Sequence, residues 1–329
     1  MNIFLTFDYE LFFGETTGSV EGCMIEPTNN LLSISKKYSI PMTFFVDVGY
    51  LIRLEAESVK HLKLKSDLSK VKIQIQEMIE NGCDVQLHIH PHWERAYYAG
   101  EKWVIDMNGC YKLDDFHQDE MEDIVTRYKV YLDNLTGKVS HTFRAGGWCI
   151  QPFDRLRNIF KKLGIKYDTS VFSGGHFESQ HYFFDFRKAP FKANYRFEED
   201  VCVENEDGFF HEYPISSLKY SPLFYWRLYI LGRMFPRSHK MVGDGIFLSQ
   251  PGRKKSVLTN FTWNHVSTDG YYSSKLETSL RYFQVKNYTD MVTIGHPKGN
   301  TNYSISVLES FVRKNHKIHT FTSFKDLDE

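Results

Sequence analysis

The sequence predicts an α/β protein built on a closed or nearly closed barrel of seven or eight mostly parallel strands. Short apolar runs rich in β-branched and aromatic residues alternate with longer amphipathic stretches, the pattern typical of βα units. Seven or eight such runs are present, which is the number that a barrel requires. Polar clusters follow several of these runs, at the positions where parallel strands of a barrel carry their catalytic residues.

Each expected strand is a run of Val, Ile, Phe, Leu or Thr, and one region in the middle of the chain is poorly bounded. The strands are expected at residues 3–7, 42–48, 84–89, 141–145, 166–171, 183–189 or 209–215, 257–263 and 291–295.

The expected helices are amphipathic stretches between these runs. Three of them end on a glycine that leads into the next strand, which is a common way for a helix to stop: Gly82, Gly137 and Gly164. The helices are expected at residues 27–39, 66–82, 119–137, 151–164 and 273–287.

No repeat, low-complexity linker or sharp change in composition divides the chain, so residues 1–329 are expected to form one catalytic domain with an insertion at about 172–255. The insertion contains an aromatic-rich segment, KYSPLFYWRLYILGRMF at 219–235. A helix of this composition either caps the barrel or forms an oligomer contact. Alternatively, it lies in a membrane interface with its rings at headgroup level. The sequence leaves the role of this segment and the oligomeric state open.

Composition excludes some classes of function. The 40 Lys and Arg residues nearly cancel the 41 Asp and Glu residues, so no long-range field favours a nucleic-acid partner. The start MNIFLTFDYE lacks the pattern of a secretory signal, and no window is apolar enough to span a bilayer, which predicts a cytoplasmic protein. The five cysteines are scattered and lack C-x-x-C spacing, so they are expected to be reduced packing residues.

Three histidines alternate in LHIHPHW at residues 87–93. Pro91 cannot continue a strand, and a bend there would bring His88 and His92, four residues apart, together as two imidazole ligands. Two imidazoles and one carboxylate make a zinc-type site with an open position, the arrangement of a hydrolase. His90 is then interpreted as a supporting residue.

The third ligand is expected from another strand end, and TFDYE supplies two carboxylates, Asp8 and Glu10. The clusters TFDYE, HIHPHW, FRAGGW, YDTS and GHPKG all follow strand candidates, so a barrel would gather them on one face.

The ordered set of these clusters resembles the polysaccharide deacetylases, the NodB-homology or carbohydrate esterase family four group. The family's usual motifs are T-F-D-D, H-x-x-x-H, F-R-P-x, D-x-S and a strand-end histidine before proline. Their counterparts here, in the same order, are Thr6 to Glu10, His88 to His92, Phe143 to Trp148, Asp168 to Ser170 and Gly295 to Pro297.

The resemblance implies a distorted (β/α) barrel and hydrolysis of an N-acetyl group or related amide on a sugar, with a divalent metal, most often Zn²⁺. The family's leading Asp, here Asp8, is the base. Tyr9 stands where a second Asp is usual, and the D-x-E spacing places Glu10 as its replacement beside His88 and His92. Asp8 is the alternative carboxylate ligand.

The remaining roles follow from the hydrolysis of an amide by a metal-activated water. His296 would protonate the leaving amine, Asp168 would orient His296, and Arg144 would keep Asp8 ionised. The candidate substrate-binding residues are Tyr9, whose neighbouring N–H groups would face the oxyanion, the turn residues Gly146 and Gly147, and the stacking wall Trp148.

The predicted function is therefore a metal-dependent hydrolase that removes an N-acetyl group from a sugar or glycoconjugate intermediate of surface polysaccharide metabolism. Its location would be cytoplasmic, with a contact to the inner membrane face if residues 219–235 lie in the interface. Two alternatives stay open: an allantoinase-like amidohydrolase, and a metal-free carbohydrate-binding pseudoenzyme that lost its metal through the change to Tyr9.

Overall fold

A curled, mostly parallel sheet forms the centre of the protein. The structure, a computed structural model, describes residues 1–248 and 252–328. Within them the sheet has nine strands, in the order β10-β11-β7-β6-β3-β2-β1-β14, with β15 paired to β1. The strands are β1 (Asn2–Tyr9), β2 (Thr43–Asp47), β3 (Asp84–Ile89), β6 (Thr142–Ala145), β7 (Tyr167–Asp168), β10 (Tyr195–Phe197), β11 (Phe210–Glu212), β14 (Asp290–Gly295) and β15 (Thr320–Thr322).

Only the β10–β11 pair of this sheet is antiparallel in the described part of the chain. Across the gap between β11 and β14, the N–H of Ser216 donates a hydrogen bond to the carbonyl oxygen of Val292, and the N–H of Val292 donates one to the Ser216 hydroxyl. A separate ribbon of β12 (Ser217–Tyr220) and β13 (Thr262–His265) lies beside this gap. The predicted α/β barrel of mostly parallel strands is thus confirmed in the form of a half-barrel.

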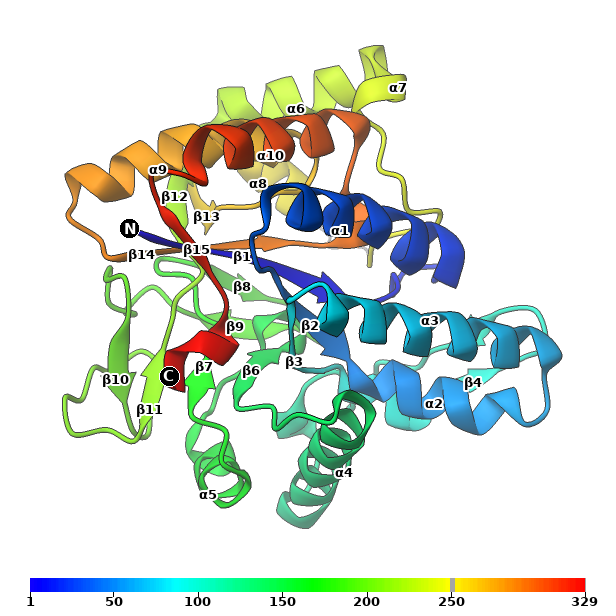
Figure 1. Ribbon diagram of the computed structural model, residues 1–329. Coiled ribbons are helices and arrows are strands. Elements are labelled where there is room, and N and C mark those ends of the chain that lie inside the picture. The colour runs from blue at the N-terminus through cyan, green and yellow to red at the C-terminus, as the bar shows by residue number, and fades with distance from the viewer. Residues whose placement is uncertain (249–251, 329) are drawn as a thin grey trace.

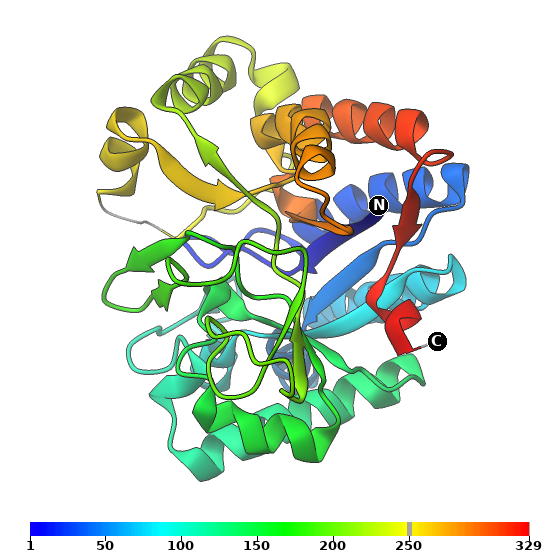
Figure 2. The same cartoon turned by 90° about the vertical axis from the view of Figure 1, so that its left-hand side faces the viewer.

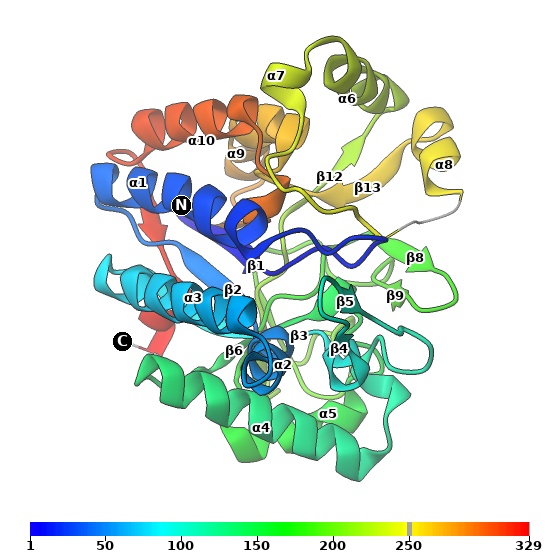
Figure 3. The ribbon, with the colours of Figure 1, turned by 90° about the vertical axis from the view of Figure 1, so that its right-hand side faces the viewer.

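Helices cover the outside of the sheet. Figures 1 and 3 show α10, α1, α3 and α4 following one another around its convex side. The covering helices are α1 (Glu26–Tyr38), α2 (Val48–Ser58), α3 (Leu62–Glu80), α4 (Gln118–Thr136), α5 (Asp154–Leu163), α9 (Leu276–Val285) and α10 (Asn302–Asn315). The ends of α4 and α5 are as predicted, because Gly137 and Gly164 adopt left-handed conformations, with φ of 66° and 71°, that stop each helix.

Several elements differ from the sequence prediction, among them two covering helices and the strand expected at residues 257–263. The helices α2 and α10 lie outside the predicted ranges. The helix α2 follows β2 without a turn. The strand predicted at 257–263 is wrong in its first half: α8 (Arg253–Thr259) occupies that part and β13 begins only at Thr262. Val257 and Leu258 supply an apolar face that packs against α6 (Pro222–Met234), and this contact favours the helix.

The predicted insertion at about 172–255 supplies several kinds of element. It contributes β10 and β11 to the main sheet, the hairpin of β8 (His176–Glu178) and β9 (Phe183–Asp185), and the helices α6, α7 (Pro236–His239) and α8. Figure 2 shows α6 and α8 at one side of the molecule, while α7 lies against α10, where the Asn302 side chain donates to the Arg237 carbonyl. Residues 249–251 of this segment lie outside the described residues. A further hairpin is formed by β4 (Tyr97–Tyr98) and β5 (Trp103–Val104).

None of the described helices is both long and apolar enough to cross a bilayer. The five cysteines are buried and unpaired, as expected for packing residues.

Candidate active site

Polar residues of four chain segments meet at the carboxyl ends of the parallel strands. β1 brings Asp8 and leads to Glu10, β3 brings His88, β6 brings Arg144, and β14 leads to His296. Because side chains two residues apart on extended backbone point the same way, Asp8 and Glu10 face the cavity together. These side chains surround the floor of a cleft of about 700 Å³.

Glu10 is the centre of a buried polar cluster. Its Oε2 lies 2.7 Å from Nε2 of His90 and 3.2 Å from Nε2 of His88, and its Oε1 accepts a hydrogen bond of 2.8 Å from the Lys298 ammonium. Nδ1 of His88 is 2.8 Å from the carbonyl oxygen of Arg144 and donates to it, which leaves Nε2 free to face Glu10. One ligand atom each of Glu10, His88 and His90 lies within 4.8 Å of the other two.

The histidine pair in this cluster differs from the predicted His88 and His92. β3 ends at Ile89, but the backbone stays extended through His90, with φ of −111° and ψ of 96°, and turns only in the short helix Pro91–Arg95. His88 and His90 therefore project to the same side. The bend at Pro91, expected to carry His92 to the site, instead carries it into the core.

His92 is fully buried among aromatic rings. Its ring stacks on Tyr111 at 5.9 Å and packs edge-on against Phe13 at 4.7 Å, and neither ring nitrogen has a hydrogen-bond partner. Burial, with the nearby His90, lowers the pKa of His92 well below its usual value, so the ring is neutral. His92 acts here as a packing residue and not as the metal ligand predicted from the sequence.

Charge compensation sets the protonation of the cluster. Burial opposes ionisation of Glu10, but the Lys298 ammonium and the imidazoles of His90 and His88 hold its pKa well below its usual value. Burial likewise opposes the charged form of His88, yet Asp8 and Glu10 raise its pKa to about 9. The Glu10 carboxylate is thus ionised, and it requires cations around it.

Asp8 is paired with Arg144, as predicted. Oδ1 of Asp8 accepts a hydrogen bond of 2.7 Å from Nη1 of Arg144, which is fully buried and also donates from Nε to the carbonyl oxygen of Thr169. The guanidinium lies 4.1 Å over the Phe45 ring. Arg144 therefore holds Asp8 in one orientation, with Oδ2 turned toward the cleft.

His296 faces Asp8 across the cluster. Its Nε2 lies 3.7 Å from Oδ2 of Asp8, while its Nδ1 lies 2.7 Å from Oδ2 of Asp269. Asp269 also accepts a hydrogen bond of 2.7 Å from the backbone N–H of His296. Burial opposes the charged imidazole, but Asp269, Asp8 and Glu10 together raise the pKa of His296.

The partner of His296 was predicted to be Asp168, and this prediction is wrong. The Asp168 carboxylate accepts hydrogen bonds from the backbone N–H and the hydroxyl of Ser170, at 2.9 and 2.8 Å, and shares one with Glu212. The hydrogen bonds of the Asp168 carboxylate are thus made within the D-x-S motif, and they stiffen the end of β7. Its contribution to the site is indirect, through Thr169 and its contacts with Arg144.

Asp269 and Lys298 escaped the sequence analysis. Asp269 follows β13 in VSTDG and is brought beside β14 by the pairing of Ser267 with Ile294. The position of Asp269 shortly after a strand could have identified it as a site residue. Because the strand was predicted at 257–263 and β13 ends only at His265, this position was not recognised. Lys298 stood in GHPKG, a strand-end cluster, where only the histidine had been assigned a role.

The four predicted substrate-binding residues have different positions. Tyr9 does not line the cleft, because alternation along β1 turns its ring into the core, where its hydroxyl donates to Gln74 at 2.7 Å. Gly147 and Trp148 line the cleft, in left-handed conformations with φ of 59° and 61°. Such a φ strains a bulky residue and turns the indole of Trp148 toward the opening.

Gly146 lies directly behind His90. A Cβ atom on Gly146 would be 2.6 Å from Nδ1 of His90 and 2.5 Å from the carbonyl oxygen of Ile89. Only glycine allows the backbone after β6 to approach β3 this closely.

The upper walls of the cleft are aromatic and apolar. Trp148 packs at 5.2 Å from the ring of His265, and Tyr111 packs at 4.4 Å from Tyr182. Further out, the wall is formed by α6 and α8. Rings of this kind offer stacking surfaces for the face of a sugar.

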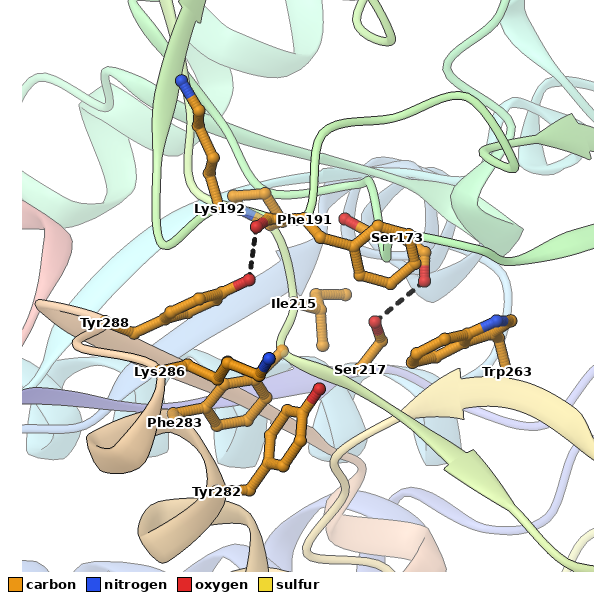
Figure 4. A pocket seen from close by; sticks show the side chains of 12 residues that line it. Ser173, Phe191, Lys192, Ile215, Ser217, Trp263, Tyr282, Phe283, Lys286 and Tyr288 are labelled. Carbon is orange, nitrogen blue, oxygen red and sulfur yellow. Dashed lines mark hydrogen bonds between the residues drawn. The ribbon is translucent and has the colours of Figure 1, made fainter.

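A second, smaller cavity of about 330 Å³ lies between β12 and α9 (Figure 4). Trp263, Phe191 and Tyr282 are among its lining side chains, with two lysines. None of its lining residues carries a carboxylate or an imidazole, so the candidate chemistry belongs to the larger cleft.

The residues of the larger cleft fit a divalent metal ion. Two imidazole nitrogens and one carboxylate oxygen converge at one buried point that opens on a cleft, which is the donor set of catalytic zinc. Glu10, His88 and His90 would hold the ion. The buried ammonium of Lys298 against Glu10 competes with such an ion.

The fold and this cluster define a half-barrel protein with a candidate hydrolase site. A family model for polysaccharide deacetylases matches residues 2–167, about half of the chain. The chain belongs to the polysaccharide deacetylase family. No curated protein matches the sequence significantly.

Solved structures of similar fold are only distantly related in sequence. A candidate polysaccharide deacetylase from Mycobacterium smegmatis is 16% identical, with a TM-score of 0.52 over 98% of this chain and 86% of that chain. The Puue allantoinase is 13% identical, with a TM-score of 0.52 over 99% and 88%. A 4-alpha-glucanotransferase from Thermococcus litoralis is 10% identical, with a TM-score of 0.50 over 99% and 38%. At these identities the likeness concerns the fold alone.

Proposed function

We propose that this protein is a metal-dependent deacetylase that hydrolyses the N-acetyl group of a sugar or glycoconjugate. One observation carries the proposal. Asp8 and His296 face each other, with Nε2 of His296 3.7 Å from Oδ2 of Asp8, beside the Glu10, His88 and His90 donor set. A base and an acid on either side of a candidate metal site are what amide hydrolysis requires.

The residues of the chain divide the reaction between them. A divalent ion held by Glu10, His88 and His90 would supply Lewis acidity, lowering the pKa of water and polarising the amide carbonyl. Asp8 takes the proton of the attacking water, and Arg144 pairs with Asp8 and holds its orientation.

His296 completes the reaction by giving a proton to the departing nitrogen. Asp269 binds Nδ1–H, so the proton for transfer resides on Nε2, which faces the cleft. Water adds to the carbonyl carbon, the C–N bond breaks, and acetate and a free amine leave.

The proposed substrate is an N-acetylated sugar, which would stack on Trp148. We place it among the intermediates of surface polysaccharide metabolism, in the cytoplasm. The five unpaired, buried cysteines support a reducing compartment.

The test combines metal analysis with acetate release from N-acetylhexosamine conjugates. The parent protein should bind about one zinc ion and release acetate, and Asp8→Asn should slow release by about 10²–10⁴-fold. Hydantoin-type substrates, assayed in parallel, separate this activity from that of an allantoinase-like amidohydrolase. A metal-free protein that releases no acetate, with Asp8→Asn indistinguishable from the parent, would reject the proposal.

Lys298 favours a second candidate, a metal-free carbohydrate-binding protein. Its ammonium already neutralises Glu10, with 2% of the residue exposed. Binding of N-acetylhexosamine oligomers that chelators do not affect, without acetate release, would support this candidate over the first.

A further inference from the structure

The helix α6 is apolar on two opposite faces, which is unusual for a helix at the edge of a protein. Its inner face packs inward, with Phe224 and Tyr225 buried, and lines the candidate catalytic cleft with Tyr225, Leu228 and Tyr229. Figures 2 and 3 show its position at the periphery, beside α7 and α8 and away from the main sheet.

The outer face of α6 carries a stripe of large apolar side chains. At about 100° per residue, Leu223, Trp226, Ile230 and Met234 fall within one narrow arc of the helix. They are 58%, 50%, 47% and 66% exposed, and Phe235, which follows the helix, is 54% exposed. Trp226 donates a hydrogen bond of 3.2 Å from its Nε1 to the Leu258 carbonyl of α8, and within the described residues all four side chains still stay about half exposed or more.

The surroundings of the stripe are strongly basic. Residues 219–255 contain eight Lys and Arg residues and a single acidic residue, Asp244, whereas the whole chain has a net charge of −1. Asp244 accepts hydrogen bonds from the N–H and hydroxyl of Ser19. Arg227 and Arg237 are exposed, and Arg227 flanks the stripe along the helix.

We propose that the outer face of α6, together with α7, docks on the surface of an anionic lipid bilayer. Exposed apolar side chains would enter the boundary between headgroups and acyl chains, and the flanking cations would pair with anionic headgroups. The charge of this segment selects a lipid surface over a second copy of the chain, because two such faces would repel each other.

Docking in this way places the cleft at the membrane. Since one face of α6 touches lipid and the other lines the cleft, a sugar attached to an apolar membrane anchor can reach Asp8 and His296 while its anchor lies along α6. The substrate class would then be a lipid-linked N-acetylated sugar. This consequence rests on the proposed function, whereas the docking itself does not.

Co-sedimentation with vesicles tests the docking. The full-length protein should bind vesicles of phosphatidylcholine and phosphatidylglycerol in equal parts at least about tenfold more tightly than vesicles of phosphatidylcholine alone, and salt should weaken the binding. Ile230→Ser with Met234→Ser, and Arg227→Glu with Arg237→Glu, should each weaken binding to the anionic vesicles at least about tenfold.

Matched controls come from the exposed face of α3. Leu62→Ser and Lys65→Glu change exposed residues there and should leave vesicle binding at the parental level. Asp8→Asn should also bind vesicles like the parent, so a failed deacetylase assay and a failed docking assay are told apart.

Three results would overturn the docking: no sedimentation with anionic vesicles, equal binding of the parent to both vesicle types, or variants of α6 that bind like the parent. A dimer in solution that Ile230→Ser with Met234→Ser dissociates would also overturn it, because a second copy would then cover the stripe.

Discussion

Asp269 holds His296 at two points, through the ring Nδ1 and through the backbone N–H, each at 2.7 Å. This double contact fixes both the tautomer of the imidazole and the direction of its Nε2 toward Asp8. In the proposed reaction, Asp269 is therefore the residue that prepares His296 to act as an acid.

Asp269→Asn should lower kcat by about 10²–10⁴-fold, because the amide cannot stabilise a protonated imidazole. Asp269 raises the pKa of His296, so its removal lowers that pKa. A general acid works only while protonated, and the alkaline limb of the pH–rate profile should move to lower pH.

Asp168→Asn is the matched control for this experiment. Its carboxylate contacts Ser170 and Glu212, so the alkaline limb should stay in place even if stability changes. A shift in Asp168→Asn and none in Asp269→Asn would contradict the structure and support the pairing predicted from sequence.

His90→Gln and His92→Phe distinguish the two candidate ligand pairs. His90→Gln removes a donor beside Glu10 and should weaken zinc binding by at least about 10–100-fold, the loss that even the outer partners of a metal site can cause. His92→Phe preserves the stacking on Tyr111 and should retain zinc.

Zinc content after dialysis, read by mass spectrometry, reports the difference between the two histidine variants. Circular dichroism confirms that both are folded. If His90→Gln retains zinc and His92→Phe loses it, the ligand pair is His88 and His92, as predicted from the sequence.

Lys298→Met removes a buried ammonium and leaves Glu10 without its nearest cation. In the presence of a chelator, the variant should lose about 3 kcal/mol of unfolding free energy, since a charge is left buried. Zinc should then raise its Tm more than it raises the Tm of the parent, because the ion becomes the main compensating charge.

The control for Lys298→Met is Lys129→Met, which breaks another well-buried lysine pair, with Asp133 at 2.6 Å in α4. It should be destabilised without any added response to zinc. Equal zinc-induced shifts in Tm for both variants would refute competition between Lys298 and a metal.

Glu212→Gln should stabilise the protein at neutral pH. Burial, together with Asp168, raises the pKa of Glu212 well above its usual value, so this carboxyl is held neutral in the folded state. A raised pKa in the folded protein means that its stability is full below about pH 4, the unfolded value, and falls as pH rises.

Gln at position 212 is neutral at every pH and keeps a hydrogen bond to Val171. Denaturant unfolding between pH 5 and 8 should therefore show a flatter profile and a gain of roughly 1 kcal/mol or more at pH 8. The exposed Glu206→Gln should match the parent, and a Glu212→Gln profile as steep as the parent's would disprove the explanation.

The sheet and the meeting of polar clusters at one face were predictable from sequence, because alternating strands and helices constrain where strand ends lie. Asp8 and Arg144 lie together for this reason. Local conformation was harder: the bend at Pro91 was foreseen, but not that extended backbone would persist through His90. The pairing of Asp269 with His296 depends on a contact between Ser267 and Ile294, which no local pattern encodes.

Gly146 determines how much variation the site tolerates. With 2.6 Å between its virtual Cβ and the His90 ring, any other amino acid must rotate the imidazole or push β3 aside. The half-barrel can survive such a shift, whereas a donor set that requires three atoms within a few ångströms of one another cannot. Mutational drift at this single position would therefore silence the chemistry while leaving a folded molecule behind.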